Sequence, residues 1–172
     1  METPKKIEIV EVDPKSPSFD EVEKTIRRVF GSMSFSERMS FWAYRHKESY
    51  FVKKLMRLFG VASLLNVWVA KNQYGEICGT TGLYTCCKDE KEAMWLSWFC
   101  VPSSKRGKGI GKKLLEFSIE KAREHSKAYL RLYTTTDPNE AAAQVLYENY
   151  GFTKIKERKH LNWVKIEREL KL

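Results

Sequence analysis

The stretch from Trp95 to Phe117 constrains the fold of this chain more than any other part of the sequence. Trp95–Val101 is a run of mainly apolar and aromatic residues, short enough for a buried strand. Pro102–Lys108 is a basic loop, and from Gly109 onward apolar residues recur at helical spacing: Leu114, Leu115, Phe117, Ile119 and Ala122. The stretch therefore predicts a buried strand, a basic glycine-rich turn and an amphipathic helix in direct succession.

This succession of elements is typical of a site that binds anions. The first amides of a helix have no backbone partners, and the helix dipole is positive at that end. Glycine allows another molecule to approach closely and permits turns that other residues cannot adopt. The turn contains Gly107, Gly109 and Gly111 and the basic residues Lys105, Arg106, Lys108, Lys112 and Lys113. Together these features indicate a site for phosphate groups.

Two other glycine-rich phosphate loops do not fit the residues of this turn. A P-loop requires GxxxxGKS or GxxxxGKT, but the lysines here stand at other positions and no Ser or Thr follows them. A dinucleotide-binding loop requires GxGxxG early in the chain, with an acidic residue about 20 positions later. Gly107, Gly109 and Gly111 form a different pattern and lie past the middle of the chain.

Two motifs instead resemble those of the GNAT superfamily of N-acetyltransferases. Arg106-Gly-Lys-Gly-Ile-Gly111 matches the pattern Q/R-x-x-G-x-G/A of that family's pyrophosphate loop. Leu146–Phe152, with the sequence LYENYGF, is similar to the family's LYExxGF segment, and the spacing between the two motifs also fits. The resemblance covers roughly residues 75–155, and the order of elements predicted elsewhere is compatible with it.

Hydrophobic periodicity and turn residues predict the other elements of the chain. Strands are expected at residues 7–12, 64–71, 76–85, 95–101, 128–135, 152–156 and 161–169. Helices are expected at 19–30, at 35–59 as one helix or two, from 109 onward, and at 137–149. Ser34 and Glu37 form a capping box before the second helical region. At the last helix Asp137 is the cap, Pro138 takes the first position and Glu140 is the reciprocal partner.

These elements predict one α/β domain over residues 1–172. Antiparallel strands come first, and a right-handed crossover helix then leads to a parallel strand. The resemblance implies a GNAT-like mixed sheet of about seven strands with helices on both faces. It also implies that the fourth and fifth strands splay apart, and that acetyl-CoA lies in the gap as a cosubstrate, with no metal ion required.

The resemblance also implies which residues hold acetyl-CoA. Phe99 and Val101 would present backbone groups to its pantetheine arm, and one of their amides could bind the thioester oxygen. The pyrophosphate would lie on the loop formed by Arg106, Gly107, Lys108, Gly109, Ile110, Gly111 and Lys112. Asn139 resembles a family asparagine that bonds the cofactor, although the usual position, seven residues before the tyrosine, is Glu140 here. Each of these residues could also be an ordinary strand, turn or first-turn residue.

The reaction implied is the attack of an amine on a thioester, which requires an acid for the departing thiolate. Tyr147 aligns with the family tyrosine in that role, and a phenol with a pKa near 10 is protonated at neutral pH. It could instead be a core aromatic residue of an amphipathic helix, next to Val145, Leu146 and Tyr150.

No general base is assigned. Several relatives carry one on the fourth strand, but counting back in twos from Val101 gives Phe99, Ser97 and Trp95, none of which is a base. Trp95, Trp98 and Phe99 could wall the acceptor pocket or simply pack in the core. The other candidates are Glu92, Glu37, His46 and Glu48, each of which could also be a solvated surface residue. A water molecule, or loss of the proton to bulk solvent, could replace a base.

Composition predicts a globular cytoplasmic protein with no membrane association. Hydrophobic residues make up 42% and charged residues 31% of the chain, and no apolar run has the length of a membrane span. The first residues lack the apolar core of a signal peptide. None of the four cysteines forms a CxxC pair, which favours reduced, buried thiols: Cys78, Cys86, Cys87 and Cys100.

The formal net charge of +9 leaves other functions to weigh. A nucleic-acid-binding protein would suit the charge, but the chain shows no recognised nucleic-acid motif or basic helix face. An acyl-CoA-binding or regulatory module without catalysis would explain the missing base, although Tyr147 argues against it. The function expected is therefore acetyl transfer from acetyl-CoA to a primary amine of a small molecule or protein, by direct attack in a ternary complex. The protein is expected to be a monomer or a homodimer.

Overall fold

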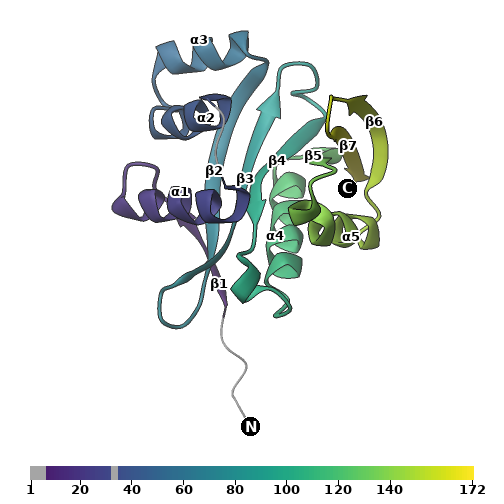
Figure 1. The fold of residues 1–172 in the computed structure, drawn as a ribbon. Helices are drawn as coiled ribbons and strands as arrows, with labels where there is room; N and C mark the ends of the chain where they lie inside the picture. The colour runs from purple at the N-terminus through teal and green to yellow at the C-terminus, as the bar shows by residue number, and fades with distance from the viewer. Residues whose placement is uncertain (1–6, 32–34) are drawn as a thin grey trace.

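A seven-stranded mixed sheet forms the centre of the structure. The computed structural model describes residues 7–31 and 35–172. The strands are β1 Glu8–Val12, β2 Val61–Lys71, β3 Ile77–Cys86, β4 Ala93–Cys100, β5 Tyr129–Thr135, β6 Thr153–Lys159 and β7 Val164–Lys171. Across the sheet their order is β1-β2-β3-β4-β5-β7-β6 (Figure 1). Neighbouring strands are antiparallel except β4 and β5, which are parallel.

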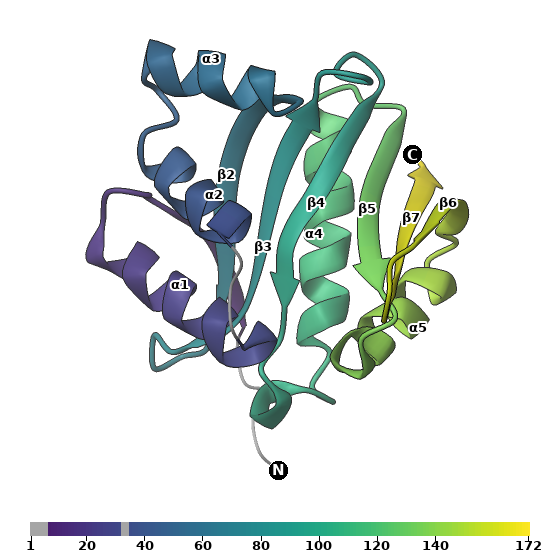
Figure 2. The ribbon, with the colours of Figure 1, turned by 45° about the horizontal axis from the view of Figure 1, so that its top comes forward.

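Helices cover both faces of this sheet, which confirms the predicted fold class (Figure 2). The α-helices are α1 Pro17–Phe30, α2 Phe35–Arg45, α3 Tyr50–Leu58, α4 Ile110–Glu124 and α5 Ala141–Asn149, and the short 3-10 turns are η1 Ser103–Lys105 and η2 Pro138–Glu140. The region predicted as one helix or two is thus α2 and α3. Ser34 of the predicted capping box lies outside the described residues, as does the side chain of Glu37. Within the described residues, no helix has the length and apolar character needed to cross a membrane.

One hydrophobic cluster lies between the sheet and the pair α1–α2. Phe19, Val22 and Ile26 of α1 are fully buried against strand β2. Phe41 and Tyr44 of α2 join the same cluster. The apolar stripe predicted for residues 19–30 therefore faces the core, as helical spacing requires.

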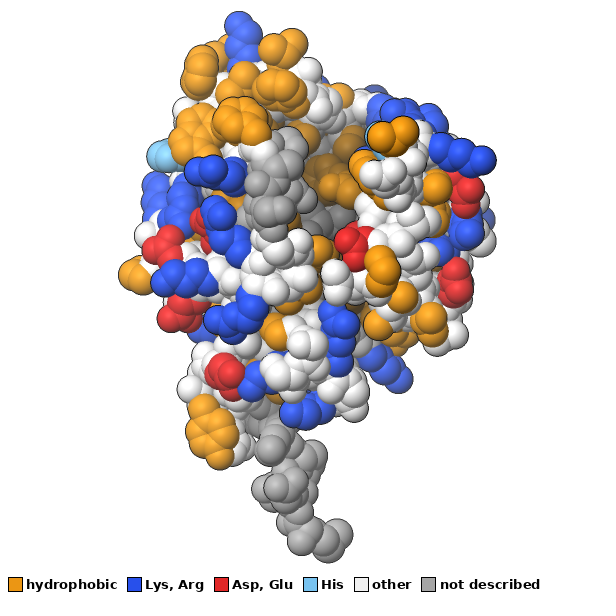
Figure 3. Space-filling view, viewed as in Figure 1, with side chains coloured by type: hydrophobic (Ala, Val, Ile, Leu, Met, Phe, Trp, Pro, Cys, Tyr) orange, Lys and Arg blue, Asp and Glu red, His pale blue; other side chains and the backbone are white. Residues whose placement is uncertain are grey.

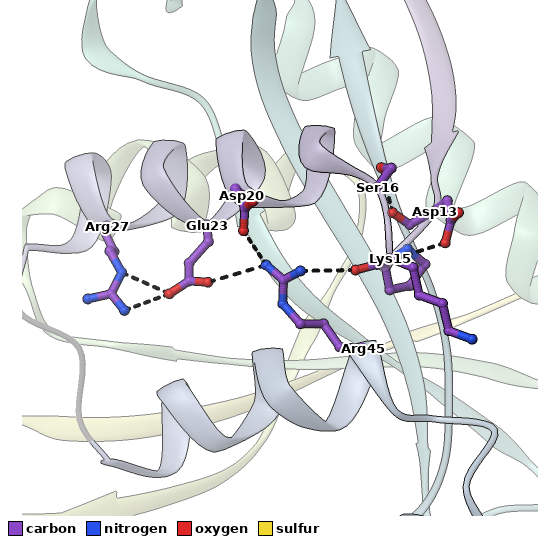
Figure 4. Close-up of polar contacts among 8 residues, drawn as sticks. Asp13, Lys15, Ser16, Asp20, Glu23, Arg27 and Arg45 are labelled. Carbon is purple, nitrogen blue, oxygen red and sulfur yellow. Dashed lines mark hydrogen bonds and ion pairs between the residues drawn. The ribbon is translucent and has the colours of Figure 1, made fainter.

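Arg45 fixes α2 against α1 (Figure 4). Its guanidinium binds Asp20, lies 3.9 Å from Glu23 of α1 and donates a hydrogen bond of 3.3 Å to the Pro14 carbonyl. The same guanidinium lies 4.9 Å from the centre of the Phe19 ring. Each contact is partly exposed and contributes little alone, but together they hold the two helices as one wall of the molecule.

The predicted amphipathic helix, α4, covers the opposite face of the sheet. Leu114, Leu115 and Ala122 are fully buried, and Ile119 is 6% exposed. Ser118 is buried as well. Its hydroxyl donates a hydrogen bond to the Leu114 carbonyl and forms another with the Thr81 hydroxyl. The helical spacing seen in the sequence therefore placed the right residues in the core.

Strands β4 and β5 separate soon after they start. Their parallel pairing consists of Ala93 with Tyr129, Met94 with Leu130, and Trp95 with Arg131. Beyond that point β4 stays with β3 as far as Cys100, and β5 stays with β7 as far as Thr135. The carboxyl ends of β4 and β5 therefore face a gap, as the resemblance implied.

A β-bulge in β4 accompanies this separation. Cys100 pairs with Thr80 and Ser97 with Gly82, so Trp98 and Phe99 together oppose the single residue Thr81. Trp98 has a φ of 49°, a rare value for a residue other than glycine. The bulge bends the end of β4 away from β5.

Because of the bulge, the prediction that Val101, Phe99, Ser97 and Trp95 lie on one face of β4 is wrong. Ser97 lies against Tyr44 with 3.3 Å between hydroxyls, and Trp98 contacts Phe41 with ring centres 4.6 Å apart. Both therefore face α1 and α2. Phe99 points to the other face, where its ring centre lies 5.6 Å from that of Tyr147. Phe99 and Ser97 do not share a face, because the bulge inserts one residue into the alternation.

Arg131 of β5 holds the closed end of the gap together. Its guanidinium contacts Asp89 at 2.6 Å, Glu92 at 3.0 Å and Glu169 at 2.6 Å. Asp89 also accepts a hydrogen bond from the Trp95 indole. Burial opposes the charge on Arg131, but its hydrogen bonds to Asp89 and Glu169 outweigh that effect and raise its pKa.

We expect Arg131→Gln to lower the free energy of unfolding by about 2–3 kcal/mol, because it leaves the buried Asp89 carboxylate without its cation. Arg123→Gln is the control, since Arg123 pairs with Glu120 on the exposed face of α4 and its loss should amount to less than about 1 kcal/mol. Urea unfolding measures both variants. Equal losses would show that the Arg131 cluster does not secure the base of the gap.

Candidate functional site

A cavity of about 640 Å³ opens where β4 and β5 separate. In Figure 3 the surface is hollowed in the upper centre, with hydrophobic side chains around the hollow. Residues from both faces of the sheet line the cavity: Tyr44 and Leu64 on the α1–α2 side, and Gly111 and Tyr147 on the α4–α5 side. The cavity therefore passes through the sheet, and we call it the cleft.

The loop between β4 and α4 forms one end of the cleft. Gly107 and Gly109 have φ values of 74° and 73°, which only glycine adopts without strain. Helix α4 then begins at Ile110, and no side chain caps it. Its first amides are thus free to bind a ligand at the positive end of the helix dipole. The strand, glycine turn and helix start therefore follow one another as the sequence predicted, and anion binding by this turn stays a prediction.

Most of the loop residues predicted from the sequence line the cleft: Arg106, Gly107, Gly109, Ile110, Gly111 and Lys112. Lys108 is exposed and is not among the residues that line the cleft. Lys105 points elsewhere, because its ammonium binds Glu76 at 2.6 Å. The Arg106 side chain donates from Nε to the Val101 carbonyl at 3.0 Å, which ties the loop to the end of β4. Phe99 and Val101 also line the cleft.

Tyr147 of α5 faces the cleft from beneath the gap. Its side chain is 4% exposed and packs between Phe99 and Phe152, with ring centres 5.6 and 5.5 Å away. No hydrogen bond holds its hydroxyl within the described part of the chain. Burial, and then the charge of Glu140, raises the pKa of Tyr147. The phenol therefore carries its proton at neutral pH and can donate it to a ligand.

Asn139 and Glu140 both line the cleft, but they differ in their contacts. The backbone N–H of Asn139 donates a hydrogen bond of 2.8 Å to the Asp137 carboxylate, so Asp137 caps this turn as predicted. Glu140 was predicted to reach back to the Asp137 backbone, and this is wrong. Its carboxylate accepts hydrogen bonds of 2.8 Å from both the backbone N–H and the hydroxyl of Thr135. Burial raises the pKa of Glu140.

The separation of the strands explains why Glu140 binds Thr135. Thr136 donates its N–H to the Val164 carbonyl of β7, so the N–H of the preceding residue points to the opposite edge of β5. That edge faces β4, which has already turned away. Glu140 therefore supplies the acceptor that a paired strand would otherwise give. No local pattern predicts this contact, because it depends on the gap between β4 and β5.

The general-base candidates lie away from the cleft where the structure describes them. Glu92 contacts Arg131 at the closed end of the gap, the His46 ring lies at a tilt beside Trp42, and Glu48 pairs with Lys53 on the surface. None of these three lines the cleft. The side chain of Glu37 lies outside the described residues. Trp98 and Phe99 do line the cleft, whereas Trp95 does not.

Sequence reasoning missed four hydroxyl groups among the described residues on the α1–α2 side of the cleft: Ser40, Tyr44, Tyr84 and Ser97. Tyr44 is buried, and its hydroxyl lies 3.3 Å from both the Leu83 carbonyl and the Ser97 hydroxyl. Helical spacing from Phe41 could have placed Tyr44 in the core. Nothing local in the sequence marks these residues as neighbours, since they come from α2, β3 and β4.

Comparison with known proteins agrees with this geometry. The family model described as acetyltransferase (GNAT) domain matches residues 63–154, more than half of the 172-residue chain. The chain belongs to the GNAT acetyltransferase family. The match spans β3, β4, α4, β5 and α5, and therefore the elements that form the loop and the gap. No curated protein matches the chain by sequence.

Several solved structures share this fold. A GNAT acetyltransferase from Staphylococcus aureus Mu50 is 22% identical, with a TM-score of 0.70, and the alignment covers 96% of this chain and 99% of that one. A GNAT acetyltransferase from Elizabethkingia anophelis, solved with acetyl-CoA bound, is 20% identical with a TM-score of 0.63 and coverage of 96% and 98%. A chain of the NatC complex, bound to Gag peptide and CoA, is 23% identical with a TM-score of 0.69 and coverage of 97% and 99%.

We expect Glu140→Ala to lower the free energy of unfolding by about 1–2 kcal/mol, because two Thr135 donors lose their acceptor. Glu140→Gln should lower the free energy of unfolding by less, since its amide oxygen can still accept a hydrogen bond from the Thr135 N–H. Asn139→Ala is the neighbouring control and should change stability by less than about 0.5 kcal/mol. Urea unfolding measures the series, and an Asn139 effect as large as that of Glu140 would contradict the role given to Glu140.

Proposed function

We propose that this chain transfers the acetyl group of acetyl-CoA to a primary amine by direct attack in a ternary complex. The observation that carries this proposal is the course of the cleft through the sheet, from the glycine loop on one side to Tyr44 and Leu64 on the other. Two substrates can enter from opposite sides and meet at the gap without either one leaving. The acceptor is a small molecule or a polypeptide.

In this proposal the cosubstrate occupies the α4 side of the cleft. The pyrophosphate lies on the amides of Gly107–Lys112, with Arg106 and Lys112 beside them, and Asn139 is a further contact. The pantetheine arm runs along the gap and bonds backbone groups of Phe99 and Val101, in place of the missing strand partner. The acetyl-CoA bound to the Elizabethkingia anophelis protein of the same fold supports acetyl-CoA as the ligand.

The transfer itself needs few groups. The amine nitrogen attacks the thioester carbonyl carbon, and a backbone amide of Phe99 or Val101 stabilises the charge on the oxygen. The carbon–sulfur bond breaks, and its electron pair stays on the sulfur. The Tyr147 phenol gives its proton to that thiolate, and the nitrogen releases one proton, which returns to the phenol through solvent. The products are the N-acetyl amine and CoA.

The free cysteines of the chain support a reducing compartment. Cys78 and Cys100 are buried thiols, Cys86 is half-buried and Cys87 is exposed. Burial raises the pKa of Cys100 to about 11, so it is a poor nucleophile. We therefore place the protein in the cytoplasm and give no thiol a role in the transfer.

A turnover assay with acetyl-CoA and a panel of amines and peptides, read by product mass, tests the function. The proposal predicts a product heavier by one acetyl group. Tight binding of acetyl-CoA with no acetylated product from any acceptor would instead favour a non-catalytic acyl-CoA-binding module.

We expect Tyr147→Phe to lower kcat by about 10²–10³-fold, because the thiolate then leaves without a proton donor. The dissociation constant of acetyl-CoA should change by less than about threefold, since the ring still packs between Phe99 and Phe152. The raised pKa of Tyr147 also predicts that wild-type kcat does not fall between pH 7 and 9 through loss of this proton. Discontinuous product assays measure kcat, and calorimetry measures the dissociation constant of acetyl-CoA. An unchanged kcat would remove Tyr147 from the mechanism.

We expect Gly109→Ala to weaken acetyl-CoA binding about tenfold or more, because a side chain at this φ distorts the turn that presents the helix amides. Gly75→Ala is a matched control: Gly75 has a φ of 77°, and an added Cβ meets no atom within 4 Å at either position. Both variants should lose about 1–2 kcal/mol of stability. Isothermal calorimetry with acetyl-CoA separates them, and equal affinities would contradict the loop as the pyrophosphate site.

A further inference from the structure

The α1–α2 side of the cleft, which we call the acceptor arm, differs in chemistry from the cofactor side. Its apolar and aromatic lining residues are Val29, Phe30, Val61, Leu64, Tyr84 and Trp98. Resting on the function proposed above, we propose that the acceptor is the α-amino group of a polypeptide whose first side chain is bulky and apolar. The charges and the hydroxyl groups of the arm favour such an acceptor.

The acceptor arm has an uncharged lining where the structure describes it. Among the described residues that line the cleft, Arg106, Lys112 and Glu140 carry a charge, and all three lie on the cofactor side. Both carboxylate oxygens of Glu140 are already bound to Thr135. An ammonium group in the acceptor arm would therefore give up water without gaining a carboxylate partner among the described lining residues, which is unfavourable. This described lining favours an amine that enters in its neutral form.

The acceptor arm carries the phenol groups of Tyr44 and Tyr84. Tyr44 shares hydrogen bonds with the Leu83 carbonyl and the Ser97 hydroxyl, and burial raises its pKa to about 12. Burial also raises the pKa of Tyr84 well above its usual value. Both phenols stay protonated at neutral pH, so neither can take a proton from an ammonium ion. The described part of the arm thus leaves the amine to lose its proton before it binds.

Amines differ in how readily they lose the proton that the arm does not take. A peptide α-amino group has a pKa of about 7.7–8.0, whereas a lysine side chain has one of about 10.4. At neutral pH the neutral fraction of the α-amine is therefore roughly 400-fold larger. The arm should accordingly select α-amines over alkyl amines, and polyamines are disfavoured further by the net charge of +9 on the protein.

The surroundings of the arm favour a polypeptide over a free amino acid. A free amino acid would bring a carboxylate into an arm whose described lining residues include no cation. Next to the arm, α2 and α3 carry a run of exposed large hydrophobic residues: Phe35, Trp42, Tyr50, Phe51 and Leu58. Hydrophobic side chains gather over these helices in Figure 3. Such a surface suits contact with a chain that continues beyond its first residue.

A peptide with both kinds of amine tests this inference. The wild-type protein is incubated with acetyl-CoA and peptides that have a free N-terminus and one internal lysine, with Leu, Phe, Ser or Asp as the first residue. Tandem mass spectrometry locates the acetyl group. We expect at least 100-fold preference for the α-amine over the lysine, and at least tenfold higher kcat/KM for Leu or Phe than for Asp.

Three results would overturn the inference while leaving acetyl transfer intact: acetylation of the lysine side chain or of spermidine at a higher rate, equal use of all first residues, or faster acetylation of 2-phenylethylamine than of the Phe peptide. The last result would assign the arm to a small apolar amine. If no acceptor yields product, the proposed function fails together with the inference.

A charge placed in the arm provides a second test. Leu64→Glu puts a carboxylate into the lining, whereas Val145→Glu makes the same change on α5 at a residue that is 57% exposed and does not line the cleft. We expect Leu64→Glu to lower kcat/KM for the Leu peptide at least tenfold and to narrow the preference over lysine. Val145→Glu should leave both values unchanged. Acetyl-CoA binding by both variants confirms that they fold, and equal kinetics would contradict the arm as the acceptor site.

Discussion

The loss of hydrogen bonding between β4 and β5 beyond Trp95 is the constraint on which the rest of the structure depends. Each strand keeps its outer neighbour, so each has an inner edge of backbone groups without a strand partner. Such groups need other acceptors and donors. At the end of β5, the Glu140 carboxylate accepts the hydrogen bond of the Thr135 N–H. Arg131 joins the strands where the gap closes. In the function we propose, the pantetheine arm bonds the remaining edge of β4.

This gap separates two environments that suit two different substrates. Free helix amides, Arg106 and Lys112 lie on the α4 side, where an anion can bind. Aromatic and aliphatic side chains lie on the α1–α2 side, and Arg45 holds these helices together. In the function we propose, the charged side receives the cosubstrate and the apolar side receives the acceptor. Tyr147, buried between Phe99 and Phe152, lines the cleft on the α4–α5 side.

Sequence reasoning predicted the features that local residues determine. The spacing of Leu114, Leu115 and Ala122 and the glycines of the turn define α4 and its exposed amides. The bulge at Trp98 was missed, because it depends on contacts between strands. Gly82 inside the predicted strand was one sequence signal of this irregularity. A Cβ at this position would approach the Ser97 hydroxyl to 2.7 Å, so the glycine makes room for Ser97. Glu140 was misassigned because Thr135, five residues earlier in the chain, competes with the cap for its carboxylate, and only the fold leaves the Thr135 N–H without a strand partner.

Amide hydrogen exchange, measured with and without acetyl-CoA, tests the central claim most directly. If the gap and the helix start receive the cosubstrate, exchange should slow at the amides of Gly107–Lys112 and of Phe99–Val101. The α1–α2 side should change little until an acceptor analogue is added. Slower exchange confined to other parts of the chain, or unchanged rates in both of these segments at saturating acetyl-CoA, would contradict the account.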